Sequence, residues 1–546
     1  MTRAPRRTAP PSQPSSRSSA SRSSASRSAE SPERPGWRDL PGVVTVTVVP
    51  AVVALAAGLC NLGGPPPWRD EAATISAAGR TLPELAHLLQ SVDAVHGLYY
   101  LVAHVVADLS GTGEVALRLP SVVAGALAAA GTGALGRALG SPRAGLYGGV
   151  LLALMPIFSR YVQEARPYSL AAAAAVGATL LLLRLVRSPT SGVLAAYAAA
   201  LTVLGYLNLF AFLVAAAHGV ALILSRGPLL RWACAATPAL AAVAPLAWLG
   251  SRQSEQVDWI SPPDASDVGR LAVELFGDLG GATGPGVAPL TWGLAIFGLA
   301  GAAVAGVRGA RAARGADEPT ARHTPEPPAE APAHAPGGHG ALVRLTLPWL
   351  LVPALVLLTI SWTGHPVYVF RYVFCCVPAA ALLAGAGLAA LPPGLAAAVL
   401  AAWLGLSVPG QFATRGPDGR QDDPRPVMAL LAAEARPGDG VLFVPAKVRK
   451  YTMVYPSVFG RLSDVALALS PERDGSFPGR ETGPRALAAR LDGLRTLWVV
   501  GHTGRHTMPA RRRALVARSF TPAGHWTFRG LFVARYLPKD RPEPSR

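Results

Sequence analysis

Runs of apolar residues, each close to the length that crosses a lipid bilayer, constrain the fold of this chain more than any other feature. Eleven of them begin near residues 42, 119, 144, 168, 191, 208, 232, 289, 342, 371 and 394. A helix needs about 20 residues to cross the hydrocarbon core. Only 15% of the 546 residues are charged, whereas a soluble domain carries about 25%. The sequence therefore predicts an α-helical polytopic membrane protein with about 11 transmembrane helices.

Basic residues fall in every second loop between these runs, and this alternation predicts the topology. They are Arg137, Arg143, Arg184, Arg187, Arg226, Arg231 and the run over 308–314. Cytoplasmic loops carry the excess of Lys and Arg, so these loops and the N-terminus are expected in the cytoplasm. The loops expected outside are 64–118, 160–167, 251–288 and 362–370. We interpret the net charge of +18 as topology, and no nucleic acid partner is expected.

Composition also divides the chain into domains. Residues 1–40 are rich in Ser, Arg and Pro and predict a disordered cytoplasmic tail. Residues 41–410 form the transmembrane domain, with the first extracytoplasmic loop at 64–118. Residues 308–340 are rich in Pro, Ala and Glu and predict a disordered cytoplasmic loop. The four cysteines lie in apolar runs, which excludes a disulfide framework and a Cys-x-x-Cys metal site.

The C-terminal region, residues 411–546, has ordinary charge and shorter apolar runs. A helix is expected to end near Gly438, and the runs at 440–444 and 496–500 predict strands. The segment 525–537 has the pattern of a hairpin. We expect a small extracytoplasmic α/β domain here.

Asp70 and Glu71 are adjacent carboxylates just beyond the first apolar run, at the expected lipid–water boundary. A carboxylate in this position can act as a general base toward an acceptor hydroxyl. The structural alternative is that Asp70 caps the helix predicted over AATISAAGR. The doublet alone favours the capping role.

The rest of the first outer loop predicts two helices that lie in the membrane interface. TLPELAHLLQ carries a capping box, with Thr81 as the N-cap and Glu84 at the third helical position. In the segment 95–109, His96 and His104 interrupt an apolar face. TLPELAHLLQ is too short to span, and a span at 95–109 would invert every later loop and break the charge alternation. Both segments therefore suit interfacial helices. Alone, His96 fits a packed or solvated histidine better than a catalytic one.

Further candidates lie beside the second span. Arg118, at its outer end, can snorkel to the interface or hold a phosphate with its guanidinium fork. The second outer loop brings Glu164, Arg166 and Tyr168 into one short turn. Ionisable residues at a membrane boundary are functional candidates. The alternative for this turn is a surface ion pair between Glu164 and Arg166.

Five motifs occur in order along the chain. They are W-x-D-E (68–71), H-G-L-Y-Y (96–100), G-x-x-E-x-A-L-R-L-P-S (111–121), Q-E-A-R-P-Y (163–168) and F-R-Y-V (370–373). Together they resemble the polyprenyl-phosphate-sugar-dependent glycosyltransferases of the GT-C superfamily. The resemblance is to the protein mannosyltransferase and lipid A aminoarabinose transferase branch, in its actinobacterial form. One departure is H-G-L at 96–98, where members usually have H-P-P-L.

The resemblance implies a function and residue roles. A sugar, mannose or a related one, passes from a polyprenyl-phosphate donor to an acceptor hydroxyl on the outer face of the membrane, with inversion. The acceptor is a protein, a glycolipid or a glycan, and the surroundings are membrane lipid. Asp70 would be the catalytic base, with Glu71 assisting. Residues implied to bind substrate are His96, Arg118, Glu164, Arg166, Tyr168, Arg371 and Tyr372. The sequence shows no dedicated metal-ligand cluster, so neither a metal nor another cofactor is expected.

Two other classes of function compete with this one. A transporter or flippase would place its charges near the bilayer midplane and often shows internal repeats, whereas here the charges gather at one face. A non-enzymatic cell-envelope assembly protein would use the outer domain for docking and would tolerate loss of Asp70 and Glu71.

The predicted topology has a direct test. A cysteine placed at position 480 should react with a membrane-impermeant reagent added outside the cell, and a cysteine at position 325 should not. The expectation follows from the alternation of arginine-rich loops. Labelling at position 325 would overturn the topology, including the outer placement of Asp70.

Overall fold

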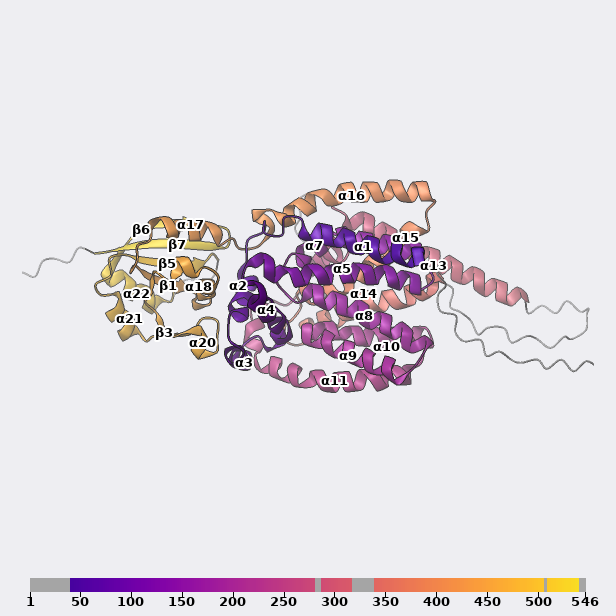
Figure 1. Ribbon diagram of the computed structural model, residues 1–546, viewed down its shortest axis with the longest axis horizontal. Coiled ribbons are helices and arrows are strands. Elements are labelled where there is room, and N and C mark those ends of the chain that lie inside the picture. The colour runs from indigo at the N-terminus through magenta and orange to yellow at the C-terminus, as the bar shows by residue number, and fades with distance from the viewer. Residues whose placement is uncertain (1–39, 280–285, 317–337, 505–507, 540–546) are drawn as a thin grey trace, which may run out of the picture. The chain divides into compact units, whose positions relative to one another are not determined.

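Helices account for nearly all of the described chain up to Arg415 (Figure 1). The computed structural model describes residues 40–279, 286–316, 338–504 and 508–539. The first helices are α1 (Leu40–Leu59), α2 (Arg69–Ala78), α3 (Leu82–Ser91), η2 (Ala94–His96), α4 (Gly97–Ser110), α5 (Glu114–Ala138), α6 (Pro142–Leu154), α7 (Pro156–Val162) and α8 (Tyr168–Arg187). Those that follow are α9 (Ser191–Leu207), η3 (Leu209–Leu213), α10 (Val214–Leu224), α11 (Leu229–Arg252), η4 (Ser254–Val257), α12 (Ala265–Leu275), α13 (Ala288–Ala316), α14 (Gly338–Thr363), η5 (Phe370–Tyr372), η6 (Phe374–Cys376), α15 (Val377–Ala389) and α16 (Pro393–Arg415).

The long helices confirm a polytopic membrane architecture. Within the described ranges, seven helices are long and apolar enough to cross a membrane, and α6 with α7 makes an eighth if the bent pair counts as one span. Three of the predicted runs form shorter apolar helices, at Ser191–Leu207, Leu209–Leu224 and Phe374–Ala389. Each predicted run therefore contains helix, but the count of eleven spans is not confirmed.

The α6–α7 pair bends by 65° because of a proline. Pro156 is the first residue of α7, and it has no N–H to donate to the preceding turn. The next N–H, that of Ile157, donates instead to the carbonyl oxygen of Gly277 (3.1 Å). This bend ends the helical pair close to the second outer loop, where Glu164 and Arg166 lie.

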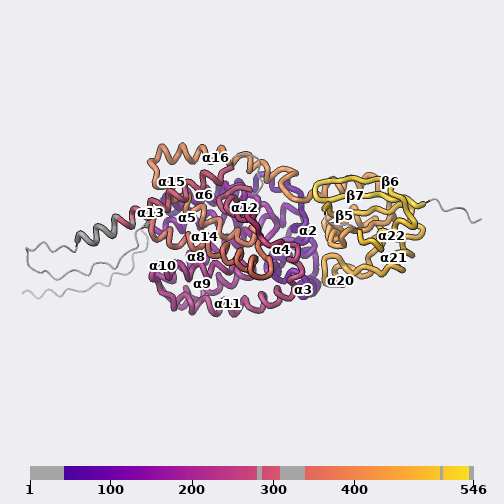
Figure 2. Tube along the Cα trace, turned by 180° about the vertical axis from the view of Figure 1, so that it is seen from behind, coloured from indigo at the N-terminus to yellow at the C-terminus, as the bar shows by residue number. Residues whose placement is uncertain are grey.

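Small residues let the central helices approach closely. A Cβ added to Gly145 of α6 would lie 2.3 Å from the Gly133 oxygen of α5. A Cβ added to Gly385 of α15 would lie 2.4 Å from the Ala144 oxygen of α6. Helix α6 is therefore packed between α5 and α15. Helices α16 and α11 lie on opposite sides of the bundle in both views (Figures 1 and 2).

The C-terminal residues carry the strands among the described ranges (Figure 1). The strands are β1 (Gly440–Val444), β2 (Ser463–Asp464), β3 (Leu467–Leu469), β4 (Arg480–Glu481), β5 (Leu497–His502), β6 (Phe520–Thr527) and β7 (Leu531–Pro538). The helices there are η7 (Pro417–Gly419), α17 (Arg425–Glu434), η8 (Ala446–Lys450), α18 (Tyr451–Val454), α19 (Pro456–Phe459), α20 (Pro471–Asp474), α21 (Pro484–Leu491) and α22 (Ala510–Ser519).

Five of these strands form one sheet in the order β2-β1-β5-β7-β6. Strand β1 runs parallel to β2 and β5, while β7 runs antiparallel to β5 and β6. In β1, Val441 and Phe443 enter one apolar layer, and Leu442 and Val444 enter the other. Successive residues of a strand face opposite sides, so a sheet covered on both faces needs the unbroken apolar run that the sequence shows. The predicted α/β organisation of this region is confirmed.

Several predicted boundaries differ from the observed elements. Helix α13 continues to Ala316, so the start of the loop expected at 308–340 is helical, and residues 317–337 lie outside the described residues. Helix α16 continues to Arg415, a few residues past the expected boundary at 410. The expected disordered tail, 1–40, also lies outside the described residues except for its last position.

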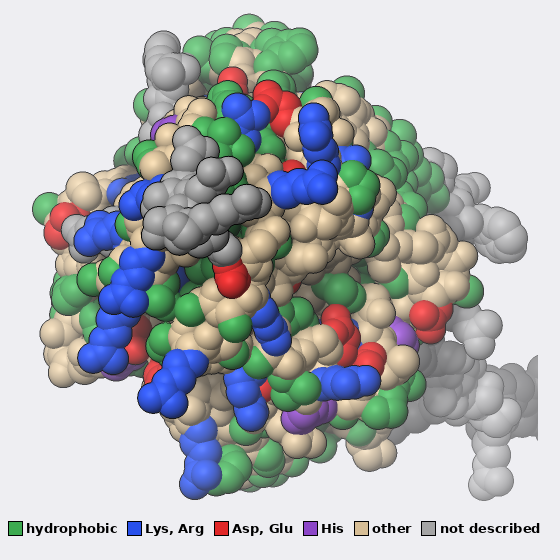
Figure 3. Space-filling model, turned by 90° about the vertical axis from the view of Figure 1, so that its left-hand side faces the viewer, with side chains coloured by type: hydrophobic (Ala, Val, Ile, Leu, Met, Phe, Trp, Pro, Cys, Tyr) green, Lys and Arg blue, Asp and Glu red, His purple; other side chains and the backbone are tan. Residues whose placement is uncertain are grey.

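The described residues from Gly42 onward belong to one compact unit, and helices α2 and α3, in the loop expected outside at 64–118, pack against the C-terminal residues within it. Lys and Arg side chains are spread over the face shown in Figure 3, with carboxylates among them. The C-terminal ion pairs include Arg480–Asp474 and Arg512–Glu481. Basic side chains therefore also lie among the C-terminal residues. The sequence interpretation, by contrast, placed the basic excess of the chain in the loops between spans.

Candidate active site

Asp70 and Glu71 both lie in the first turn of α2, but neither caps it. The N-cap is Trp68, and it has extended backbone angles. The sequence-based alternative that Asp70 caps this helix is therefore wrong. Adjacent residues of a helix point in directions about 100° apart, and the two carboxylates have different surroundings.

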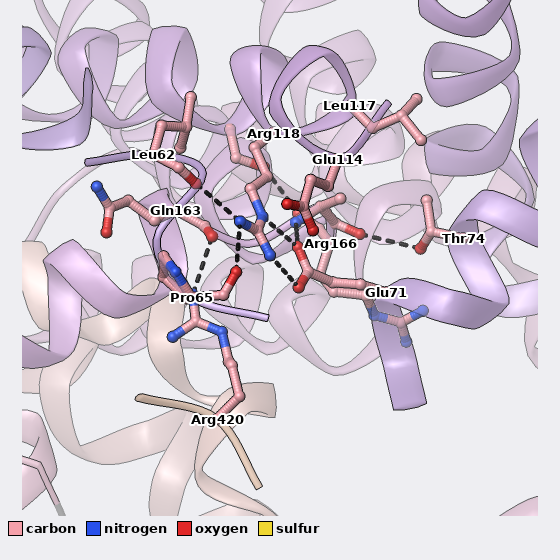
Figure 4. Close-up of polar contacts among 12 residues, drawn as sticks. Leu62, Pro65, Glu71, Thr74, Glu114, Leu117, Arg118, Gln163, Arg166 and Arg420 are labelled. Atoms are coloured by element: carbon pink, nitrogen blue, oxygen red, sulfur yellow. Dashed lines mark hydrogen bonds and ion pairs between the residues drawn. The ribbon is translucent and has the colours of Figure 1, made fainter. Parts of the chain in front are cut away.

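Glu71 is buried in an ion pair with Arg118 (Figure 4). Arg118 Nε and Nη2 each donate to one Glu71 carboxylate oxygen at 2.7 Å. The remaining N–H groups donate to backbone carbonyl oxygens of Leu62, Pro65 and Pro66. A guanidinium has five N–H donors, so Arg118 has none left for a phosphate. Its expected roles, as a phosphate ligand or as a snorkelling surface cation, do not fit this geometry.

The Glu71–Arg118 pair joins three segments of the chain. Arg118 belongs to α5, and its backbone acceptors follow α1. Glu71 also accepts the backbone N–H of Ala165, in the second outer loop, at 2.9 Å. The pair therefore fixes α2 against two other loops, and this is a positioning role.

Asp70 faces a different cation, Arg371 of η5. The closest approach of the Asp70 carboxylate to the Arg371 guanidinium is 4.0 Å, and the two side chains are 22% and 16% exposed. Among the described residues, neither the Asp70 carboxylate nor the Arg371 guanidinium makes a hydrogen bond to the protein. The Arg371 guanidinium lies over the rings of Trp259 and Tyr372, at 5.3 and 5.8 Å.

Positive charge dominates the surroundings of Asp70. Burial by itself would raise the pKa of Asp70, but the charges of Arg371, Arg166 and Lys450 outweigh it and hold the pKa below its usual value. Asp70 is therefore ionised at neutral pH. Several cations around one carboxylate leave excess positive charge, which suits an anionic ligand.

His96 lies against Arg166 and adds a further polar group. Arg166 Nη2 is 2.7 Å from His96 Nε2. A guanidinium can only donate, so Nε2 accepts and the proton of the neutral ring is on Nδ1. Burial, reinforced by the charge of Arg166, holds the pKa of His96 well below its usual value. The Nδ1 atom is buried and without a protein partner, which leaves one free donor.

Residues 161–167, in the second of the loops expected outside, are buried. Both carboxylate oxygens of Glu164 are buried without a hydrogen-bond partner, so the alternative of a surface pair between Glu164 and Arg166 is wrong. Burial raises the pKa of the Glu164 carboxyl, and the charges of Arg420 and Arg160 oppose the shift. The Tyr168 hydroxyl is also buried and without a partner. Unpaired buried polar groups are costly, and their gathering here indicates a site.

Lys450 of η8 is a residue that sequence reasoning missed. Its side chain is half-buried, and among the described residues it has neither a hydrogen bond nor an ion pair. Burial lowers its pKa to about 8, against the attraction of Asp70. Only three lysines occur in the chain, but nothing in the sequence separates Lys450 from Lys447. The packing of η8 and α18 against α2 brings it to this site.

An ion pair between Arg69 and Asp422 holds the C-terminal residues against α2, the helix that carries Asp70. Arg69 Nε and Nη2 donate to the two carboxylate oxygens of Asp422 at 2.7 and 2.6 Å. The Asp422 side chain is fully buried. Arg420, two residues earlier, donates to the carbonyl oxygen of Gln163 at 2.9 Å (Figure 4). Sequence analysis singled out neither Asp422 nor Arg420, because the residues to which they bind lie more than 250 positions away along the chain.

The site contains no evident metal centre. Within the part of the chain that the structure describes, no three His, Cys, Asp or Glu side chains gather where they could hold a metal ion. The absence of a metal stays a prediction.

Comparisons with known proteins identify the fold. No protein-family profile and no curated protein matches the chain. The solved structure of ArnT from Cupriavidus metallidurans in the apo state is similar, with 14% identity, a TM-score of 0.55, and coverage of 89% of this chain and 97% of that one. The same protein bound to undecaprenyl phosphate gives a TM-score of 0.50 at the same identity and coverage. The oligosaccharyltransferase AglB from Archaeoglobus fulgidus is 12% identical over 93% of this chain and 76% of its own, with a TM-score of 0.45.

The chain therefore shares the fold of ArnT, and the predicted GT-C fold class is supported. At this identity the likeness does not identify the sugar or the acceptor. The mannosyltransferase branch and the actinobacterial form stay predictions.

The buried pair predicts a stability effect. Glu71→Gln should lower the free energy of unfolding by about 3–5 kcal/mol, because it leaves the Arg118 charge buried and unpaired. Glu114→Gln is the matched control: the Glu114–Arg425 pair is also short, at 2.6 Å, but its side chains are 27% and 37% exposed. Loss of an exposed pair costs about 0–1 kcal/mol. Thermal unfolding in detergent measures both. A stable but inactive Glu71→Gln protein would contradict the positioning role and favour a catalytic one.

Proposed function

We propose that this protein is a membrane glycosyltransferase that moves a sugar from a polyprenyl-phosphate donor to an acceptor hydroxyl on the outer face of the membrane, with inversion. The observation that carries the proposal is the pairing of an accessible carboxylate, Asp70, with a guanidinium, Arg371, that makes no hydrogen bond to the described protein. The likeness in fold to ArnT, solved with undecaprenyl phosphate, supports a lipid-phosphate donor.

Arg371 is the preferred ligand for the donor phosphate. Its guanidinium can form two parallel hydrogen bonds to phosphate oxygens, and no protein acceptor competes for them. Arg166 and Lys450 add positive charge around Asp70. His96 Nδ1, the Tyr168 hydroxyl and Glu164 are buried groups without protein partners, and we assign them to the sugar and acceptor pocket.

The chemistry follows from these assignments. Asp70 accepts the proton of the acceptor hydroxyl while the hydroxyl oxygen forms a bond to the anomeric carbon. The bond from that carbon to the phosphate oxygen breaks on the opposite side, and its electron pair stays on the phosphate. The leaving group gains one negative charge in this step. Arg371 stabilises that charge as it develops, which lowers the barrier.

Glu71 and Arg118 have a different role in this proposal. They satisfy each other and the surrounding backbone, so they hold α2 in place and do not contact substrate. Tyr372 contacts Arg371 through its ring and helps to hold it.

The finer assignment rests on the motifs. They favour mannose or a related sugar, a protein or glycolipid acceptor, and an outward-facing site with a cytoplasmic N-terminus. To test it, the purified protein is incubated with labelled polyprenyl-phosphate-mannose and membrane extract, and the labelled product is identified. The same assay is then repeated with polyprenyl-phosphate donors that carry other hexoses or pentoses. If none of these donors yields a labelled product, the proposed function fails.

The competing functions predict other behaviour. A transporter or flippase would translocate the labelled lipid without changing it. Its charges would lie near the midplane, whereas Asp70, Arg166 and Arg371 lie in helical turns and loops outside the candidate spans. A scaffold would keep its function without Asp70.

Asp70→Asn tests the catalytic base. The amide is nearly isosteric and cannot take a proton, so the rate of transfer should fall by about 10²–10⁴-fold. Stability should be retained, since Asp70 caps no helix and makes no short ion pair. Sugar transfer and thermal unfolding of the same preparation measure both effects. Full activity in this variant would remove Asp70 from the base role.

Arg371→Lys tests the phosphate contact. Lys keeps the charge but loses the fork, so KM for the donor should rise about 10-fold, in line with the loss of one charge-assisted hydrogen bond. Arg118→Lys is the contrasting variant, because Arg118 is saturated by protein acceptors. It should lower thermal stability and leave donor KM nearly unchanged. The reverse pattern would exchange the two assignments.

A further inference from the structure

Trp259 is a large aromatic side chain that stays 61% exposed beside the proposed donor site. The Arg371 guanidinium lies 5.3 Å from the centre of its ring. We infer that Trp259 is a positioning residue that orients Arg371 toward the donor phosphate. The inference rests on the proposed function and extends it to a residue with no assigned role.

Arg371 needs such support because other restraints on it are weak. The Asp70 carboxylate is 4.0 Å away, too far for a hydrogen bond. Its other ring contact is Tyr372, its neighbour in sequence, at 5.8 Å. An aromatic face attracts a guanidinium without supplying a conventional acceptor. Contact with Trp259 can therefore hold Arg371 while its N–H groups stay free for phosphate oxygens.

The segment that carries Trp259 is held at its beginning by hydrogen bonds to the residues that lead to His96. The side-chain oxygen of Gln253 accepts the N–H of Ala94 at 2.9 Å, and its amide nitrogen donates to the Leu89 carbonyl oxygen at 3.0 Å. The side-chain oxygen of Gln256 accepts the N–H of Asp93 at 3.2 Å. These bonds reach the turn that leads into η2 and His96.

The same segment is also held by Trp362 of α14 and by His365, which follows that helix. Trp362 Nε1 donates to the carbonyl oxygen of Pro263 at 2.7 Å. Asp258 and His365 approach to 3.5 Å. Because both ends are held, the backbone around Trp259 connects the His96 side of the site to the loop that leads to Arg371. The backbone position of Trp259, beside Arg371, is thus determined by the fold.

A second exposed tryptophan provides a matched control. Aromatic residues are enriched at membrane interfaces, so exposure alone does not indicate a role. Trp248 of α11 is 58% exposed, and its ring lies 4.1 Å from the guanidinium of Arg252. Trp248 and Trp259 each lie beside an arginine and are similarly exposed, but Arg252 is not among the charges with the largest effect on the Asp70 pKa.

The experiment compares Trp259→Ala, Trp259→Phe and Trp248→Ala. For each purified protein, kcat and KM for the polyprenyl-phosphate donor are measured, together with the affinity for polyprenyl phosphate alone. Trp259→Ala should raise donor KM and the Kd for polyprenyl phosphate about 3- to 10-fold, the range set by a partly desolvated cation–π contact. Trp259→Phe keeps a ring face and should restore most of the loss. Trp248→Ala should match the wild type.

A double-mutant cycle with Arg371→Lys decides whether Trp259 acts through Arg371. If it does, the second substitution adds little to the first, and the effects are not additive. Additive effects would mean that Trp259 contacts the lipid directly, and would overturn the inference. Wild-type behaviour of Trp259→Ala would overturn it as well, while leaving the proposed function intact. If wild-type protein does not bind polyprenyl phosphate, the proposed function falls and the inference falls with it.

Discussion

The buried pair of Glu71 and Arg118 is the interaction on which the rest of the site depends. Two charges in a water-excluded setting are tolerated only when each is fully satisfied. Arg118 achieves this with all its N–H groups, and Glu71 with the Ala165 N–H in addition. The pair joins the end of the first span, α2, α5 and the second outer loop. Asp70, the residue before Glu71 in α2, is held in place by it.

Arg118 and Arg371, the two arginines with the clearest roles, differ in how many of their N–H groups are hydrogen-bonded to the protein. Arg118 has every donor occupied by protein, and Arg371 has none occupied among the described residues. A saturated guanidinium stabilises a structure, whereas a free one beside a carboxylate can bind an anion. The same comparison separates Glu71 from Asp70. The two arginines carry the same charge, as do the two carboxylates, and hydrogen bonding distinguishes their roles.

The C-terminal residues form part of the site's surroundings. Arg69 and Asp422 link α2 to the start of this region through two short hydrogen bonds. Arg80 donates to the Ser476 carbonyl oxygen at 2.6 Å, and Lys450 adds charge near Asp70. The region that the sequence predicted as a separate α/β domain therefore supports the first outer loop and contributes a cation.

The sequence alone determined the membrane architecture, the order of the helices, the main strands and the list of candidate residues. These follow from local properties: span-length apolar runs, capping signals near Thr81, the apolar strand at 440–444 and motifs in a fixed order. Tertiary structure decided the roles. Whether a guanidinium is saturated depends on carbonyl groups about 50 positions away. The contributions of Lys450, Asp422 and Trp259 depend on packing between distant segments, because a side chain's partners and burial are set by the folded chain and not by its neighbours in sequence.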